Sequence, residues 1–91
     1  MDSKAIKARL LDAVENQCGL LVDSLERLEI EIKVTTAVIV ITLKPFRAEE
    51  DDENDVGKII GRGGRNIDAM RTLLGAFTNR YGYRVHVEVV D

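Results

Sequence analysis

A run of nine residues, 57–65, combines glycine, isoleucine and cations at a spacing that suits phosphate binding. Its G-x-x-G pattern occupies residues 61–64, where the missing Cβ of glycine lets backbone N–H groups approach an anion closely. The positive charges of the run come from Lys58, Arg62 and Arg65, and no acidic residue lies within it. These residue types predict electrostatic binding of a phosphate backbone.

Residues 56–67, VGKIIGRGGRNI, resemble the core of a KH domain, whose G-x-x-G loop clamps about four nucleotides of single-stranded nucleic acid. The turn of that family corresponds to Gly61, Arg62, Gly63 and Gly64. With the segments that follow it, the chain is similar in particular to the small stand-alone bacterial KH-domain proteins of the KhpA family. The resemblance is close over residues 56–91 and rests on pattern alone over residues 1–44.

The resemblance implies a groove for single-stranded RNA beside this turn. Three isoleucines would form its apolar floor, and an exposed edge of the last strand, around Arg84 to Glu88, would offer backbone groups to base edges. The residues expected to bind RNA are Lys58, Ile59, Ile60, Gly61, Arg62, Gly63, Gly64, Arg65, Asn66, Ile67, Arg84, Val85 and His86. The structural alternative is a simple tight turn between two helices, with the isoleucines in the core.

The first half of the chain supplies a helix and two strands. Apolar residues at three-to-four spacing predict a helix over residues 3–17, with Asp2 or Ser3 as its N-cap and Gly19 as its stop. Residues 20–26 fit either a further helical turn or an extended piece. Residues 28–34 alternate as in a strand with one wet face, and the nearly all-apolar residues 37–43 suggest a central strand covered on both sides. The turn type at Thr35-Thr36 is left open, and Pro45 ends the second strand.

The second half supplies two helices and a strand. Ile59 and Ile60 lie on a short helix that the glycines end, and a second helix starts near Arg65. The apolar face of that helix is predicted to comprise Ile67, Met70, Leu73, Leu74, Phe77 and Tyr81. Gly82 is the expected residue after its C-terminus, and a strand from Tyr83 to Val90 closes the chain.

These elements predict an α+β fold of order α-β-β-α-α-β. Two consecutive helices between the second and third strands form a crossover, so those strands should pair in parallel, whereas the first two form an antiparallel hairpin. The result is a three-stranded mixed sheet with helices packed on one face, as the resemblance to a type II KH domain also implies. Ninety-one residues suit one domain, with residues 1–35 as an N-terminal extension and 36–91 as the βααβ core.

Composition argues against several other classes of protein. Hydrophobic residues at 45% and charged residues at 32% are ordinary for a globular chain, and no segment is apolar enough for a bilayer span or signal peptide, so a cytoplasmic location is expected. A dinucleotide fingerprint fails because its last glycine would fall at Asn66. No catalytic set or cofactor motif is present, so neither an enzyme nor a metal or other cofactor is expected. Cys18, the single cysteine, is expected to be a buried, inert thiol.

The net charge of −3 is unevenly distributed. Residues 1–56 contain seven Lys/Arg against thirteen Asp/Glu, a net charge of −6, whereas residues 57–91 contain six against three, a net charge of +3. The half with the glycine turn is therefore the basic half, and local charge governs nucleic-acid binding. Residues 47–55 form an acidic loop, with six carboxylates between Glu49 and Asp55 that are either merely solvated or screen the basic turn.

The resemblance also implies partners and a cellular role. It points to single-stranded RNA as ligand, to a possible homodimer, and to a possible larger RNA-binding partner of the KhpB (Jag) type. In the family, these features are linked to RNA chaperoning, post-transcriptional regulation and cell shape. The acidic loop, longer than is usual in the family, favours the alternative of a KH-fold protein-interaction module whose main ligand is a protein. The RNA target and base preference do not follow from the sequence.

Overall fold

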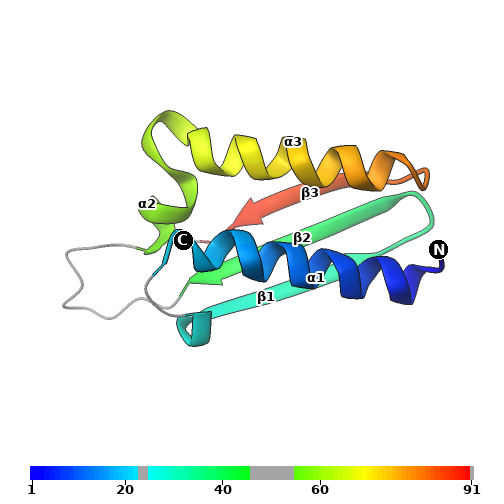
Figure 1. The fold of residues 1–91 in the computed structure, drawn as a ribbon, viewed down its shortest axis with the longest axis horizontal. Coiled ribbons are helices and arrows are strands. Elements are labelled where there is room, and N and C mark those ends of the chain that lie inside the picture. Colours follow the sequence, from blue (N-terminus) through cyan, green and yellow to red (C-terminus); the bar gives the residue numbers. More distant parts are fainter. Residues whose placement is uncertain (23–24, 46–54, 91) are drawn as a thin grey trace.

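The computed structural model describes residues 1–22, 25–45 and 55–90. Its main elements are α1 (Ser3–Gly19), β1 (Leu28–Val34), β2 (Val38–Pro45), α2 (Asp55–Ile60), α3 (Arg65–Asn79) and β3 (Arg84–Val89) (Figure 1). Two short 3₁₀ turns, η1 (Leu25–Arg27) and η2 (Arg62–Gly64), precede β1 and α3. The order of helices and strands is the predicted α-β-β-α-α-β. The predicted acidic loop lies almost wholly outside the described residues.

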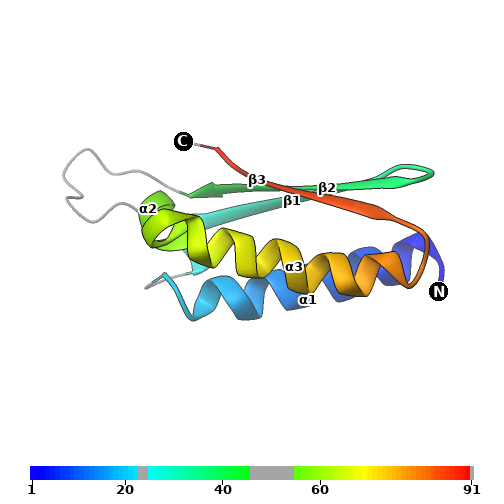
Figure 2. The ribbon, with the colours of Figure 1, turned by 90° about the horizontal axis from the view of Figure 1, so that it is seen from above.

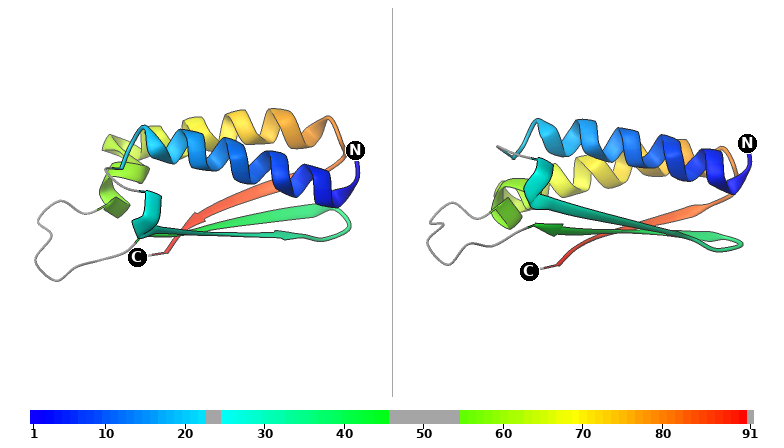
Figure 3. Two further views of the ribbon diagram at one scale, coloured as in Figure 1. Left: turned by 60° about the horizontal axis from the view of Figure 1, so that its bottom comes forward. Right: turned by 90° about the horizontal axis from the view of Figure 1, so that it is seen from below.

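The three strands form one mixed sheet in the order β1-β2-β3. β1 pairs with β2 antiparallel, and β2 pairs with β3 in parallel, with Ile41 opposite Val87. Helices α1 and α3 lie side by side on the same face of this sheet (Figures 2 and 3). The predicted α+β fold, with a mixed sheet and helices on one face, is therefore confirmed.

Helix α1 begins where the sequence predicts and ends slightly later. Asp2 is its N-cap, because the Ala5 N–H donates a hydrogen bond of 2.8 Å to Asp2 Oδ1. Four residues spaced four apart face the sheet and are fully buried: Ile6, Leu10, Val14 and Cys18. The helix continues through Gly19, two residues beyond the prediction. The sequence did not decide between a helical turn and an extended piece for residues 20–26. Of these residues, Leu25 and Glu26 lie in the 3₁₀ turn η1.

The hairpin between β1 and β2 closes around Thr35 and Val38. The Thr35 N–H and Oγ1 both donate to the Val38 carbonyl, each at 2.9 Å, and the Val38 N–H donates to Thr35 Oγ1 at 3.2 Å. Threonine hydroxyls often stabilise turns in this way. No residue other than glycine has a positive φ among the described residues, so this turn is not of the primed type that short hairpins favour.

The prediction that the central strand is covered on both sides is wrong for one face. Ile39, Ile41 and Leu43 face the helices and are fully buried, whereas Val38, Val40 and Thr42 on the other face are only partly buried. None of the described helices covers that face (Figure 2). The apolar, β-branched composition of the strand reflects its central position between two neighbours as much as burial.

Charged side chains of β1 and the end of β2 line this open face. Lys44 Nζ lies 3.3 Å from Glu31 Oε2, and Lys33 Nζ lies 3.6 Å from Glu31 Oε1. The hydrogen bond and charge of Lys44, together with the charge of Lys33, lower the pKa of Glu31. The long aliphatic stems of such lysines can shield the apolar part of the open face while their charges stay in water.

Helix α3 is amphipathic, and its buried face is narrower than predicted. Ile67, Met70 and Leu74 are buried, and Phe77 and Tyr81 pack partly against them, whereas Leu73 is 60% exposed. At the C-terminus, the Gly82 N–H donates to the Asn79 carbonyl and the Tyr83 N–H donates to the Thr78 carbonyl. With φ at 82° for Gly82, this pair of bonds forms a Schellman motif, which confirms the predicted stop.

The Cys18 thiol should be chemically inert in the folded protein. Its side chain is fully buried, and this burial raises the pKa of the thiol to about 11. Because the thiolate is the reactive species, we expect no reaction with an aromatic disulfide reagent at pH 8 until denaturant unfolds the chain. Absorbance of the released thiolate measures this. Rapid reaction of the folded protein would show instead that α1 opens independently of the sheet.

Candidate nucleic-acid interface

The turn between α2 and α3 is defined by glycine conformation and backbone hydrogen bonds. The Gly61 N–H donates to the Gly57 carbonyl at 2.8 Å and ends α2, and the Gly64 N–H donates to the Gly61 carbonyl at 3.1 Å. Gly61, Gly63 and Gly64 all have positive φ. With φ at 76° and ψ at 171°, Gly61 occupies a region that is essentially restricted to glycine. This conformation leads the chain from one helix directly into the next.

Asn66 fastens the turn to the end of α2. Its Nδ2 donates a hydrogen bond of 2.9 Å to the Lys58 carbonyl. A Cβ placed on Gly61 would lie 2.7 Å from both Cγ and Nδ2 of Asn66, so the glycine leaves the space that the amide needs. The sequence predicted Asn66 as an RNA contact. In the structure its amide nitrogen holds the turn in shape.

Positive charge surrounds the turn. Arg62 and Arg65 are exposed, and neither forms an ion pair with another described residue, while Lys58 is partly buried. Helix α3 begins at Arg65, so its first N–H groups and the positive end of its dipole lie at the turn. A Cβ on Gly63 would meet no atom within 4 Å, which shows that this point of the turn is open. A phosphate can therefore approach the backbone here.

The three isoleucines divide between core and surface. Ile59 is fully buried and Ile67 is 5% exposed, whereas Ile60 is partly exposed. The first two belong to the main apolar core and fix α2 and α3 against the sheet. Of the three predicted floor residues, only Ile60 therefore retains appreciable accessible surface beside the turn.

The structure places the predicted strand residues away from the turn. β3 starts near the C-terminal end of α3 and runs back toward α2, so its start at Arg84 lies at the opposite end of the sheet from the glycines (Figure 1). Arg84 and His86 are exposed and alternate with the more buried Val85 and Val87, so their side chains face the open side of the sheet. Val85 packs toward α3, where its Cγ1 lies 3.9 Å from a Cβ built on Gly75. Residues 87–89 are the part of β3 nearest the turn.

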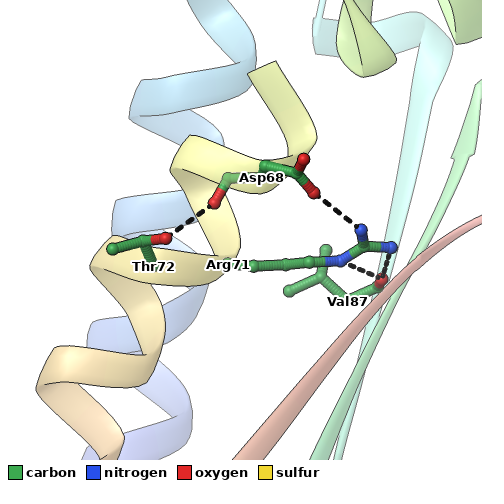
Figure 4. A network of polar contacts seen from close by, with 4 residues as sticks. All are labelled: Asp68, Arg71, Thr72 and Val87. Carbon is green, nitrogen blue, oxygen red and sulfur yellow. Dashed lines mark hydrogen bonds and ion pairs between the residues drawn. The ribbon is translucent and has the colours of Figure 1, made fainter. Parts of the chain in front are cut away.

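The outer edge of β3 is partly covered by Arg71 of α3. Arg84 donates its N–H to Ala37, directly before β2, and Val90 donates to Leu43 of β2. Val87 has the opposite parity, so its backbone points outward. Arg71 Nη2 and Nε donate to the Val87 carbonyl at 3.0 and 3.3 Å, and Nη1 donates to Asp68 Oδ1 at 3.2 Å (Figure 4). The Thr72 hydroxyl donates to the Asp68 carbonyl at 3.0 Å.

Arg71 and Asp68 were not among the residues singled out in the sequence. Gly64, Asp68 and Arg71 are spaced four and three apart, which is the spacing of one helix face, and this pattern could have indicated that they lie together. Among the described residues, no three His, Cys, Asp or Glu side chains lie close enough to hold a metal ion. No described helix is long and apolar enough to cross a membrane.

Comparison with protein families gives a match to the model described as "KhpA/KhpB, KH domain", over residues 12–89. That range contains every element from the body of α1 to the end of β3, the glycine turn included. No solved structure matches significantly.

Curated relatives fall into two groups by length of match. The chain is 33% identical to RNA-binding protein KhpA of Mycobacterium tuberculosis over 88 residues, which cover 94% of this chain and 96% of the relative. It is 54% identical over 39 residues to the protein of the same name from Borreliella burgdorferi, and 49% identical over 37 residues to that of Chlamydia pneumoniae. These shorter matches cover 43% and 41% of this chain, and about half the length of each relative, at 48% and 47%.

Proposed function

The chain belongs to the KhpA/KhpB family of KH-domain proteins, and we propose that it binds single-stranded RNA through the glycine turn. Relatives matched over nearly their whole length carry the name RNA-binding protein, which supports the proposal. The family is characterised by an RNA-binding fold and not by a reaction. We further propose that residues 1–91 act as one KH unit in the cytoplasm.

The observation that carries this proposal is the open, cationic turn at the start of α3. Gly63 has free space around it, Arg62 and Arg65 are exposed, and the first N–H groups of α3 lie beside them. A phosphate bound here would meet backbone donors, a helix dipole and two exposed cations together. Phosphate contacts of this kind hold a strand in place without reading its sequence.

The bases of the bound strand would lie across Ile60 toward the outer edge of β3. Ile60 offers apolar surface next to the turn, and Val87 and Val89 direct their backbone groups outward at the same end of the sheet. Both kinds of contact suit single-stranded RNA, whose unstacked bases can splay onto a protein surface and form hydrogen bonds with their edges. Of the strand residues expected from the sequence, Arg84 and His86 would contact only a longer RNA that reaches the open sheet face.

For the cellular role, we propose RNA chaperoning or post-transcriptional regulation, together with a larger partner of the KhpB (Jag) type and with self-association. Family membership is the support for this role. A second candidate function is a KH-fold module that mainly binds protein. It is favoured by a groove between α1 and α3 whose apolar lining includes Leu20 and Leu73, which are 87% and 60% exposed.

Fluorescence anisotropy with labelled oligonucleotides tests the RNA proposal. We expect saturable binding of single-stranded RNA hexamers, weaker binding of a duplex of the same length, and a slope of log affinity against log salt of about −2 to −3, as three or four phosphate contacts would give. Preference for the duplex would contradict a KH mechanism. Absence of binding to any RNA would favour the protein-binding candidate.

A further inference from the structure

Arg71 is held in a fixed position between α3 and the edge of the sheet. Two of its nitrogens donate to the Val87 carbonyl and a third donates to Asp68, at distances of 3.0 to 3.3 Å. The side chain is nevertheless 48% exposed. Figure 4 shows the guanidinium lying between the Asp68 carboxylate and the strand, held from both sides. A long, flexible side chain is thus ordered at the surface where the proposed RNA groove meets β3.

The guanidinium of Arg71 has more N–H donors than its present hydrogen bonds use. Arginine has five N–H donors in a planar, rigid arrangement. Three of them are used in the bonds to Val87 and Asp68, so two N–H groups have no partner among the described residues. One of these groups is on Nη1 and the other on Nη2, and the side chain that carries them is 48% exposed. Arg71 can therefore bind a pair of acceptors without giving up its present contacts.

The same contacts change the chemistry of the strand edge. An outward-facing carbonyl would normally accept a hydrogen bond from the amino group of a base. At Val87 that carbonyl already accepts from two nitrogens of Arg71. The strand edge therefore presents the N–H donors of Arg71 at this point, and a base that lies against Val87 meets donors in place of its carbonyl.

We propose that Arg71 determines base preference, selecting a base with two adjacent acceptors at the position next to Val87. Cytosine has such a pair in O2 and N3, and guanine has one in O6 and N7, which is the usual target of a two-donor arginine contact. Adenine places its amino group beside both N1 and N7, and uracil has N3–H between its two carbonyls. This inference rests on the proposed RNA function and adds a specificity to it.

The test uses four RNA hexamers with uridine at the outer four positions and the central dinucleotide varied as CC, GG, AA or UU. We expect the wild-type protein to bind the CC and GG probes about fivefold or more tightly than the AA and UU probes. In Arg71→Lys the charge remains but the planar pair of donors is lost. The ratio of its affinity for the CC and GG probes to that for the AA and UU probes should fall toward one. The salt dependence of binding should stay close to that of the wild type.

Asp68→Asn is the matched control. It removes the charge on Asp68 while leaving Arg71 on the Val87 carbonyl, so it should keep the CC and GG preference and bind all four probes more tightly. Thermal melting of each variant ensures that affinities are compared for folded protein. Equal wild-type affinity for the four probes, or an unchanged preference in Arg71→Lys, would overturn the inference and leave the RNA proposal standing. If the wild type bound none of the probes, both would be overturned.

Discussion

Replacing Arg62 and Gly63 together by aspartate is expected to lower the affinity for single-stranded RNA about 100-fold at 0.1 M salt. The two substitutions reduce the charge of the turn by three units, and each phosphate contact is worth about fivefold at that salt concentration. The fold should survive, because the variant keeps Gly61 and Gly64, and a side chain at Gly63 would meet open space. Aspartate also tolerates the left-handed conformation that Gly63 adopts, with φ at 65°.

A matched control carries the same change of charge at the other end of α3. Asn79→Asp with Arg80→Asp also removes three units, at two exposed positions about 20 Å along the helix from the turn. We expect this control to change RNA affinity only slightly and to lose even that difference as salt is raised. Equal weakening by both double variants, each with a native circular dichroism spectrum, would mean that overall charge and not the turn governs binding.

The Gly61→Ala variant is expected to lose stability and RNA binding together. Alanine at φ 76° and ψ 171° costs about 1–3 kcal/mol, and its Cβ would collide with Asn66 at 2.7 Å. Displacing Asn66 breaks its hydrogen bond to the Lys58 carbonyl and so releases the turn from α2. For a chain of this length, each kcal/mol corresponds to about 4–8 °C in Tm, so melting should occur roughly 10 °C lower.

Two other glycines provide the comparison. Gly57 lies within α2 with no atom near its missing Cβ, so Gly57→Ala should leave Tm unchanged or raise it slightly. Gly63 has a positive φ but free space around its missing Cβ. The Gly63→Ala variant should therefore lose an intermediate free energy of unfolding, about 1–2 kcal/mol. If calorimetry instead gave the same Tm for all three variants, the contact between Gly61 and Asn66 would not hold the turn.

The architecture was accessible from the sequence because its signals are local and mutually consistent. The four-residue spacing of Ile6, Leu10 and Val14, the alternation in residues 28–34, and glycines at both helix ends each predicted an element that the structure contains. The two intervening helices then fixed the parallel pairing of β2 and β3. The local pattern could not show which face of the sheet lacks helices. An apolar central strand has the same sequence pattern whether helices pack on one of its faces or on both.

The sequence motif of the site was predictable, but the positions of its residues in space were not. The sequence identified the turn, yet it could not separate Ile59 and Ile67, which anchor the helices in the core, from Ile60, which remains partly exposed. Nor could it show which end of β3 lies beside the turn, since this depends on the direction in which the strand returns along the sheet. Arg71 was missed for the same reason: its partner Val87 is 16 residues away and meets it only in the folded chain.

The parallel pairing of β2 with β3 has a consequence for the order of events when the chain folds. The β1–β2 hairpin joins neighbouring residues, but Val38 meets Arg84 only after 46 intervening steps of chain, and the glycine turn lies on the segment between them. Contacts over such a separation form slowly, because the entropy of closing the loop must be lost first. We therefore expect the contacts between β1 and β2 to form before those between β2 and β3. Under the proposed function, RNA binding at the turn would require residues 84–89 to be docked against β2.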